Sequence, residues 1–245
     1  MSADDLLRGV GLDRYDINAR LKPALFVLLP LFVTVAFWIP LARTGSGVVV
    51  SLLSACGLLY LIAQTARRLG RAVERRMGNA AGRKHSARLL LHADATIAAE
   101  TKARYHAYLQ SHGLSISAPE EEQVSPDTAF SRTRSAVDWL LEHTRPNAQK
   151  TLLFNENIAY GYHRNLYGMK PVGLLIAVTA ITGHGALLWV RPLDEATLWI
   201  GLLIEAGLAV TVLLWSFVVT ESSVSDASLA YAQQLFNHCE TTTAN

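Results

Sequence analysis

Apolar residues are gathered in four long segments of the chain, and polar residues fill the stretches between them. The four segments are 23–42, 46–66, 171–190 and 197–219. Each approaches or exceeds the roughly 20 apolar residues that a helix needs to cross about 30 Å of hydrocarbon. The first two contain no Asp, Glu, Lys or Arg; the third contains only His184 and the fourth only Glu205 as ionisable residues. Core helices of soluble proteins rarely stay free of charge for this length, so the pattern predicts four transmembrane helices.

Short polar connections at 43–45 and 191–196 join these segments into two pairs. We therefore expect an all-α integral membrane protein, with four transmembrane helices arranged as two hairpins that flank a cytosolic helical domain. The first apolar segment is longer than the core of a signal peptide and follows four acidic residues, so we expect it to remain as an anchor. The predicted domains are 1–66 (N-terminal segment and first hairpin), 67–170 (cytosolic domain), 171–220 (second hairpin) and 221–245 (cytosolic C-terminal helix and tail).

The distribution of basic residues predicts the orientation. Eight Lys and Arg residues lie between Arg67 and Arg88, against the single acid Glu74, whereas each short connection has one. Basic residues near membrane spans favour the cytoplasmic side, so we expect segment 67–170 and both termini in the cytoplasm. The net charge of +2 gives no indication of nucleic-acid binding. Cys56 lies inside a span and Cys239 in the tail, so we expect no disulfide between them.

The polar segments also have helical signals. The second span continues without a stop signal into a basic stretch, which predicts one helix to Met77, with a break permitted at Gly78 and Gly82. Gly113 has the position of a residue that ends a helix. We expect further helices at 84–110, 126–144, from 148 to the third span with punctuation near Gly168 and Pro171, and 223–239, with a surface loop at 114–126 and a break at 145–147.

Glu205 is the most informative single residue. It lies about 12 Å from the outer end of the fourth span, and His184 lies about 9 Å from the outer end of the third. An ionisable side chain at such a depth costs about 2.5–3.5 kcal/mol and normally faces a bundle interior or water. Because a tight turn joins the two spans, the two side chains could pair. The two interpretations are a polar gate in a pore, or a hydrogen bond that only holds helices together.

A basic stripe leaves the membrane with the second span. It consists of Arg67, Arg68, Arg71, Arg75 and Arg76. Three interpretations are open: an anchor on anionic lipid headgroups, a site for an anionic ligand such as a nucleotide or oligonucleotide, and a docking site for a partner.

The sequence gives no sign of an active site. The segment 78–84 has one residue too few between its glycines for a P-loop and follows no predicted strand. The eight histidines form no HExxH motif and no Cys/His cluster with zinc spacing, and no serine lies in a GxSxG elbow. We therefore expect neither an enzyme nor a metal or cofactor site.

The junction before the third span contains the segment NENIAYGYHRNLYGMKP at 155–171. Its Arg164 and Lys170 could meet phosphate headgroups or carboxylates, and its tyrosines suit an interfacial belt. Because the junction connects the cytosolic domain to a span, it could transmit a rearrangement to the bilayer, or it could be an anchor with no switching role. The residues predicted to couple the two parts are Tyr160, Gly161, Tyr162, Asn165 and Gly168.

This segment, together with the opening Tyr15-Asp16, Ala19-Arg20-Leu21 and Pro23-Ala24-Leu25, resembles bacterial four-transmembrane pore-forming effectors of anti-phage defence systems, which are often encoded beside a nucleotidyltransferase. The resemblance covers the architecture of the whole chain. It implies location in the bacterial inner membrane and a cytosolic sensor that gates a membrane effector. It also implies a nucleotide-type signal supplied by a partner enzyme.

Our hypothesis is a homo-oligomeric effector that forms a gated pore or disrupts the membrane under control of an anionic signal. Four spans enclose little lumen, so a pore needs several copies around an axis. The alternatives are a non-conducting membrane-tethered sensor or scaffold, and a small transporter, which the lack of paired broken helices makes weaker.

Overall fold

The computed structural model describes residues 13–38, 45–144 and 152–241, and of residues 45–55 and 241 the backbone alone. The protein is all-α, as predicted: 87% of it is helical, and the described residues contain no strand. The elements are α2 (Arg14–Asp16), the π-helix η1 (Ile17–Leu21), α3 (Lys22–Trp38), α4 (Gly45–Met77), the 3₁₀ turn η3 (Gly78–Ala80), α5 (Gly82–Leu89), α6 (Ala99–Ser111), α7 (Pro119–Val124), α8 (Pro126–Thr144), α9 (Leu152–Val190), α10 (Glu195–Leu213), the π-helix η5 (Leu214–Val218), α11 (Glu221–Phe236) and α12 (His238–Thr241).

Three helical stretches are long and apolar enough to cross a membrane. They are Arg14–Trp38, Leu152–Val190 and Glu195–Val218; the second contains the third predicted span, and the others overlap most of the first and fourth. The second predicted span lies in α4, whose side chains up to residue 55 are outside the described part of the structure. Three candidate spans therefore stand, and the fourth stays a prediction.

The chain forms two compact units. Unit 1 comprises Met1–Val73 and Gly161–Glu221, and unit 2 comprises Glu74–Tyr160 and Ser222–Asn245. These units are defined by contacts between residues, whereas the predicted domains are defined by the sides of a membrane. The two sets of bounds therefore differ, and the predicted domains stay a prediction. The continuous helices α4 and α9 each contribute one part to each unit.

In unit 1, α3 and α9 run parallel. Asn165 bonds to Ala19 and Trp38 bonds to His184, and both bonds join residues 146 positions apart. An equal offset at two levels means that the helices run in the same direction with the same rise. From the level of Ala19 to that of Trp38 the helices extend about 28 Å, close to the hydrocarbon thickness of a bilayer.

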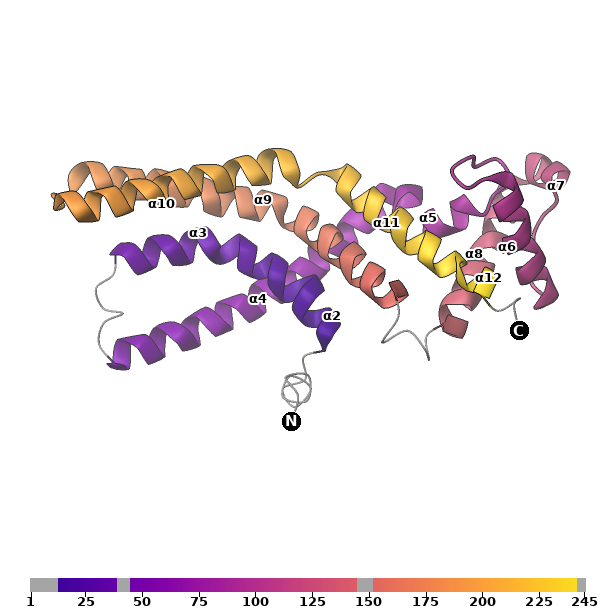
Figure 1. Ribbon diagram of the computed structural model, residues 1–245, viewed down its shortest axis with the longest axis horizontal. Coiled ribbons are helices and arrows are strands. Elements are labelled where there is room, and N and C mark those ends of the chain that lie inside the picture. The colour runs from indigo at the N-terminus through magenta and orange to yellow at the C-terminus, as the bar shows by residue number, and fades with distance from the viewer. Residues whose placement is uncertain (1–12, 39–44, 145–151, 242–245) are drawn as a thin grey trace. The chain divides into compact units, whose positions relative to one another are not determined.

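Helices α9 and α10 of unit 1 run antiparallel, side by side along their length (Figure 1). Asp194 is the N-cap of α10, because its carboxylate accepts a hydrogen bond of 3.0 Å from the Thr197 amide. The other end of the pair is packed through Gly173 of α9, where a β-carbon would collide with the buried ring of Trp215. Trp215 also contacts Phe26 of α3, with ring centroids 5.1 Å apart, so its ring links three helices.

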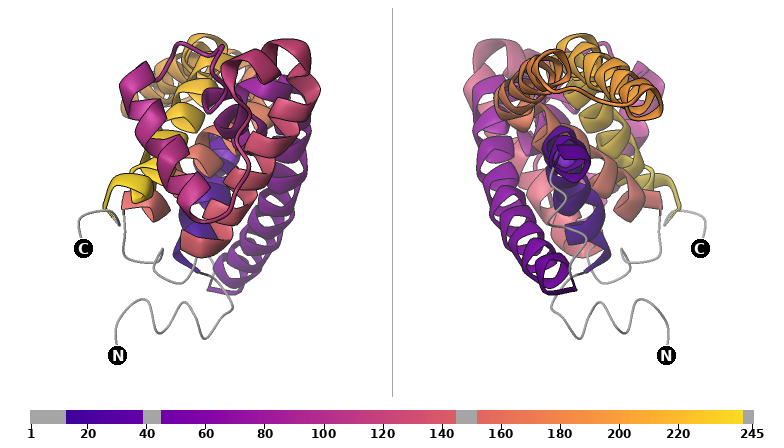
Figure 2. Two further views of the ribbon diagram at one scale, coloured as in Figure 1. Left: turned by 90° about the vertical axis from the view of Figure 1, so that its right-hand side faces the viewer. Right: turned by 90° about the vertical axis from the view of Figure 1, so that its left-hand side faces the viewer.

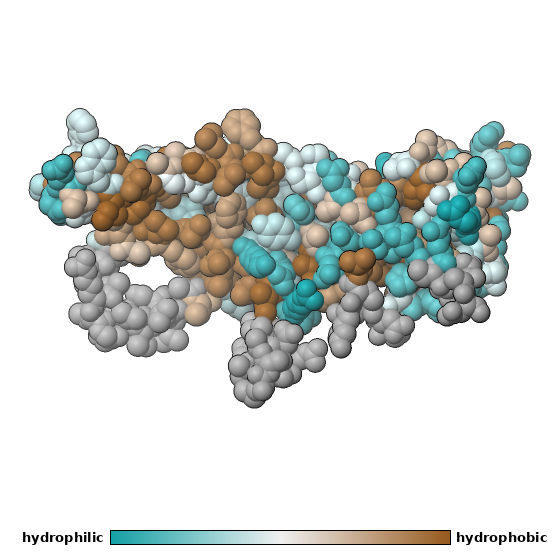
Figure 3. Space-filling view, viewed as in Figure 1, coloured by the Kyte–Doolittle hydropathy of each residue, from teal (hydrophilic) through white to brown (hydrophobic). Residues whose placement is uncertain are grey.

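The first hairpin of unit 1 is open at one end. Figure 1 and the right-hand view of Figure 2 both show the N-terminal part of α4 lying apart from α3, whereas the helices converge towards η1. Most apolar side chains of the three candidate spans face outwards, since only 11% of the apolar window of α10 is buried. Figure 3 shows the resulting apolar surface in brown over α3, α9 and α10. An apolar surface of this extent needs lipid or other protein to cover it.

Unit 2 has an ordinary buried core. Helices α5 and α8 pack together, and α6 packs against α12. The apolar stripe predicted for 126–144 is confirmed, with Val137 and Leu140 fully buried and Phe130 and Leu141 packed against the same cluster. Helix α11 contributes Leu235 and Phe236, in agreement with the predicted amphipathic helix.

Several predicted boundaries are confirmed. Helix α4 continues to Met77, and Gly78 and Gly82 then adopt positive φ angles of 56° and 64°. Gly113 has φ 80° and ends α6, with the Leu114 amide bonded to the Leu109 carbonyl and the Gly113 amide to that of Gln110. The predicted break at 145–147 lies outside the described residues.

Three expectations about the polar segments are wrong. The helix predicted for 84–110 is interrupted between Leu89 and Ala99. The loop predicted at 114–126 contains α7, whose Pro119 at the first helical turn and three following glutamates favour a helix N-terminus. Gly168 and Pro171 do not interrupt α9, which runs unbroken from Leu152 to Val190.

Candidate functional site

Asn165 of α9 bonds to the backbone of the first helix. Pro23 has no amide hydrogen, so the Ala19 carbonyl lacks its usual donor four residues further on. Asn165 is fully buried, and its Nδ2 donates to the Ala19 oxygen over 2.6 Å. A residue predicted to lie at the junction thus joins two helices that are far apart in the sequence.

Glycines let the helices of this junction approach closely. A β-carbon on Gly161 would lie 2.5 Å from the Tyr15 hydroxyl, and one on Gly168 would lie 2.7 Å from the Leu69 carbonyl carbon. On the facing helix α4, a β-carbon on Gly70 would collide with the Asn165 side chain. Gly161 and Gly168 therefore provide close contact between helices, and they do not bend α9. We call this contact region of η1, α4 and α9 the inner junction.

The aromatic residues predicted at the junction are divided between the units. Tyr160 belongs to unit 2, where it is buried and stacks on Tyr231 with ring centroids 6.2 Å apart. It is therefore a packing residue of unit 2, not an exposed interfacial anchor. Tyr162 is half-buried in unit 1 against the cluster around Trp215. The Tyr167 hydroxyl donates to Glu221 over 3.4 Å.

Lys170 has a structural role that the sequence did not suggest. Its Nζ donates to the backbone carbonyls of Ser216 and Val219, over 2.9 and 2.8 Å. These carbonyls lie at the end of η5, where a helix leaves acceptors without intrahelical partners. Two of the three N–H groups of its ammonium thus cap a helix end, and the expectation that Lys170 also meets an anion or a headgroup stays a prediction. Arg164, from the same predicted set, is half-buried in α9.

The arginines of α4 form an exposed basic face. Arg68 and Arg71 are exposed in unit 1 and make no ion pair with a described residue, and Arg75 and Arg76 are exposed in unit 2. The nearby charges of Arg20 and then Arg71, together with burial, lower the pKa of Arg67, which is half-buried. Like charges therefore gather where α4 meets η1, and the Asp16 carboxylate, which pairs with Arg20, offsets part of their repulsion.

His184 has both ring nitrogens occupied. It is fully buried, Trp38 Nε1 donates to its Nδ1 over 2.8 Å, and its Nε2 lies 3.0 Å from the Gly201 carbonyl oxygen. Because the indole nitrogen can only donate, His184 is neutral with its proton on Nε2. It therefore ties α3 and α10 to α9, and it does not pair with Glu205, as the sequence had suggested it could.

Glu205 lies one turn further along α10 than Gly201. Its carboxylate packs on the backbone of α9, with Oε1 3.0 Å from where a β-carbon of Gly185 would lie. The other oxygen, Oε2, is buried and makes no hydrogen bond with a described residue. Glu205 is thus an ionisable group inside a candidate span whose partner is not supplied by the described part of the same chain.

Unit 2 has a buried polar network around residues 90–98, which interrupt the predicted helix. Lys102 is buried, and its Nζ donates to the carbonyls of Leu91 and Asp94. Glu122 accepts the amides of His92 and Ala93, each over 2.8 Å. Burial lowers the pKa of Lys102, and nearby Asp94 and Glu122 partly oppose that shift. The network holds an irregular segment by satisfying its backbone groups.

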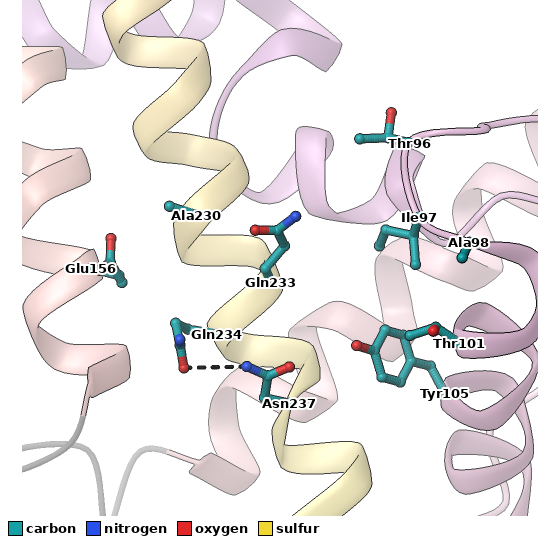
Figure 4. Close-up of a pocket in the computed structure, with 10 residues that line it drawn as sticks. All are labelled: Thr96, Ile97, Ala98, Thr101, Tyr105, Glu156, Ala230, Gln233, Gln234 and Asn237. Carbon is teal, nitrogen blue, oxygen red and sulfur yellow. Dashed lines mark hydrogen bonds between the residues drawn. The ribbon is translucent and has the colours of Figure 1, made fainter.

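The same unit has a polar cavity of 410 Å³ between the start of α6 and α11 (Figure 4). Its lining includes Thr101, Tyr105, Gln233 and Asn237, with Glu156 of α9 on a further wall. Burial, followed by the charge of Glu240, raises the pKa of Tyr105, which keeps its hydroxyl protonated. Its lining residues come from the segment before α6 and from α6, α9 and α11, so no local sequence pattern marks this cavity.

Two further residues of the site escaped the sequence analysis. Trp38 was assigned only to an apolar span, although it is the partner of His184. Pro23 begins the first predicted span, and its missing amide hydrogen leaves the Ala19 carbonyl able to accept from Asn165. Both residues stand out within an apolar segment. Trp38 carries an N–H donor there, and Pro23 lacks the amide hydrogen that most other residues have.

Among the described residues, no three His, Cys, Asp or Glu side chains are arranged to hold a metal ion. No protein-family model matches the chain, and no curated protein or solved structure is significantly similar to it.

Proposed function

We propose that the protein is a four-span membrane effector that assembles from several copies and forms a gated ion pathway. The parallel course of α3 and α9 supports this topology, because the first and third of four crossings must run in the same direction. Basic residues of α4 lie at the level of Asn165, and Trp38 lies at the level of His184. Lys and Arg favour the cytoplasmic side and Trp favours interfaces, which supports cytoplasmic termini.

The observation that carries the proposal is the buried oxygen of Glu205, which has no partner among the described residues of its own chain. A carboxylate inside a bilayer needs water, a proton or a donor from another chain. His184 is fully occupied by Trp38 and Gly201, so it does not meet that need. An assembly in which Glu205 faces water or a second copy does, and a water-filled pathway through several copies is the simplest such arrangement.

Control by an anionic signal is the second part of the proposal. The exposed Arg68 and Arg71 support an anion-binding role, because the one nearby carboxylate, Asp16, pairs with Arg20 and offsets only part of the positive charge. The resemblance to effectors of anti-phage defence suggests a nucleotide or oligonucleotide made by a partner enzyme as the source of that anion.

Ion flux from liposomes that contain the purified protein tests conduction. We expect wild-type protein to release ions, and Glu205→Leu to change the rate at least tenfold without changing the mass of the complex. Glu195→Leu is the matched control, since Glu195 is an exposed carboxylate at the outer end of the same helix, and it should conduct like wild type.

Three results would contradict the proposal. Absence of flux under every nucleotide and voltage would favour a non-conducting scaffold. Wild-type flux from both Glu205→Leu and His184→Leu would show that the gate lies elsewhere. If the detergent-solubilised protein is a monomer and no nucleotide co-purifies with it, the oligomeric, ligand-controlled assembly is excluded.

A further inference from the structure

Helices α4 and α9 of unit 1 meet at the inner junction and separate with distance from it. On α4, every seventh residue away from the junction is in turn Gly70, Ala63 and Cys56, and residues at this spacing stay on one side of a helix. Gly70 is buried, Ala63 is 5% exposed and Cys56 is exposed. Figure 1 and the right-hand view of Figure 2 show α4 diverging from α9 in this direction. The side of α4 that packs at the junction is therefore uncovered at Cys56.

The facing side of α9 becomes uncovered in the same direction. Gly168 is buried, whereas Leu175, seven residues further on, is 68% exposed, and Thr182, after seven more, is also exposed. Thr179 and Ala186 lie on the same side of the helix and are exposed. We call Leu175, Thr179, Thr182 and Ala186 the distal face of α9. Three of its four side chains are small, which lets another helix approach closely.

The threonine hydroxyls distinguish the distal face from a surface that meets only lipid. Neither Thr179 nor Thr182 makes a hydrogen bond with another described residue. By contrast, Thr34, Thr65 and Thr211 of the other apolar helices each donate to the carbonyl four residues before them. A hydroxyl in hydrocarbon needs a partner, and threonines in membrane helices supply hydrogen bonds across helix contacts. The distal face therefore has the chemistry of a helix contact.

The two uncovered surfaces lie at the same distance from the junction. Cys56 lies 14 residues before Gly70, Thr182 lies 14 residues after Gly168, and a β-carbon on Gly168 would lie 2.8 Å from the Gly70 nitrogen. Because α4 and α9 run in opposite directions, both residues lie about 21 Å beyond the junction. Helix α4 is unbroken and held at the junction, so in one chain its diverging half leaves the distal face uncovered.

We propose that the distal face of α9 binds α4 of a second copy of the chain, through the side of α4 that contains Cys56. This contact continues the α4–α9 packing of the inner junction, and it brings the hydroxyls of Thr179 and Thr182 to backbone carbonyls, each of which has a second lone pair. Because every copy contributes two different surfaces, the contact repeats from copy to copy and forms a ring where the rotation closes. The inference rests on the proposed assembly of several copies and names the surfaces that join them.

Disulfide cross-linking between two differently tagged full-length chains in membranes tests the contact. One chain contains Thr182→Cys together with Cys56→Ser, and the other keeps both natural residues, so a disulfide between these positions forms only between copies. Disulfides need Cα atoms within about 7 Å of each other, and we expect oxidation to give a dimer with both tags. Cys239 is buried and is present in every chain, so it contributes equally to all samples.

Leu203→Cys in place of Thr182→Cys is the matched control. Leu203 of α10 is 73% exposed and lies two residues after Gly201, whose carbonyl contacts His184, so it has a similar depth on another helix. It should give no dimer with both tags. Ala186→Phe, added to the Thr182→Cys chain, places a large ring on the distal face and should lower the dimer yield roughly tenfold. Leu203→Phe, added to the same chain, should leave the yield unchanged.

Absence of the doubly tagged dimer, an equal yield from Leu203→Cys, or an unchanged yield with Ala186→Phe would each overturn the inference. A disulfide within single chains that contain Thr182→Cys and natural Cys56, without the dimer, would show that the chain's own α4 covers the distal face. The mass and ion flux of the complex separate this failure from that of the proposed function. A conducting complex of several copies that does not cross-link leaves the proposed function intact, whereas a monomer contradicts both.

Discussion

The two units of this protein hold irregular backbone in different ways. In unit 1, Asn165 donates to the Ala19 carbonyl, four residues before Pro23. Lys170 donates to two carbonyls at the end of a helix. Glycines bring the helices of that unit into backbone contact. In unit 2 the irregularity is the segment 90–98, and the ionisable side chains of Lys102 and Glu122 satisfy it. Unit 1 should therefore be sensitive to added volume, and unit 2 to charge and pH.

The largest effect should follow from Gly168→Leu. A β-carbon there would lie 2.7 Å from the Leu69 carbonyl carbon and 2.8 Å from the Gly70 nitrogen, and backbone cannot move aside cheaply. We expect a loss of about 3 kcal/mol or more, seen as loss of folded protein in size-exclusion chromatography and thermal unfolding. Gly183→Leu, in the same helix but with open space around the glycine, is the control. Equal stability of the two variants would show that the inner junction is not tightly packed.

Lys102→Met should be the next most damaging change. It leaves the carbonyls of Leu91 and Asp94 buried without their donor, at a cost of about 2–4 kcal/mol. Hydrogen exchange should show faster exchange at the His92 and Ala93 amides, because the segment that they belong to loosens. Lys84→Met, which removes an exposed lysine from the same unit, should leave both measurements unchanged. Unaltered exchange in Lys102→Met would mean that the network does not hold this segment.

Asn165→Ala tests whether unit 1 also depends on single polar groups. It removes the bond to the Ala19 carbonyl and should cost about 1–3 kcal/mol. Thermal unfolding in detergent measures the loss, and Asn155→Ala, at an exposed position of the same helix, provides the reference. If Asn165→Ala is as stable as Asn155→Ala, the hydrogen bond does not stabilise the inner junction and only its glycine contacts do.

The smallest effect should be the pH dependence of unit 2. Burial is the main cause that lowers the pKa of both His85 and His106 below the ordinary value of 6.5. The unfolded chain then binds more protons than the folded one below about pH 6.5, so stability is fully present above that pH and falls as the pH drops through and below it. Unfolding measured between neutral and acidic pH should show this slope.

His106→Gln should reduce that slope, and His112→Gln, at an exposed position, should not. A slope that is identical in wild type and His106→Gln would assign the acid sensitivity to other groups.

The sequence predicted helices well where one signal dominates. Long apolar segments predicted α3 and the apolar parts of α9 and α10, and Gly113 marked the end of α6 because only glycine readily adopts its positive φ. The prediction from sequence failed at residues 90–98, where Ala and Leu favour a helix that does not form. The interruption there depends on Glu122, which is 30 residues from the His92 amide that it accepts.

The site residues show the same limit. Sequence periodicity located His184 and Glu205 at similar depth, but it could not reveal that Trp38 already occupies the histidine. A lysine in a polar segment is a candidate for anion binding, which is why the sequence suggests that role for Lys170. It could not show that a nearby helix end supplies acceptors for its ammonium. Such partners depend on which helices meet, and local pattern does not encode that.

The bond between Asn165 and the Ala19 carbonyl also sets an order of events during translation. The two residues are 146 positions apart, so the first helix is synthesised long before the ribosome reaches Asn165. Until α9 packs beside it, the Ala19 carbonyl, four residues before Pro23, lacks this donor. The first two helices therefore wait for a contact that only α9 can supply, and a chain truncated before α9 should be less stable than the full chain.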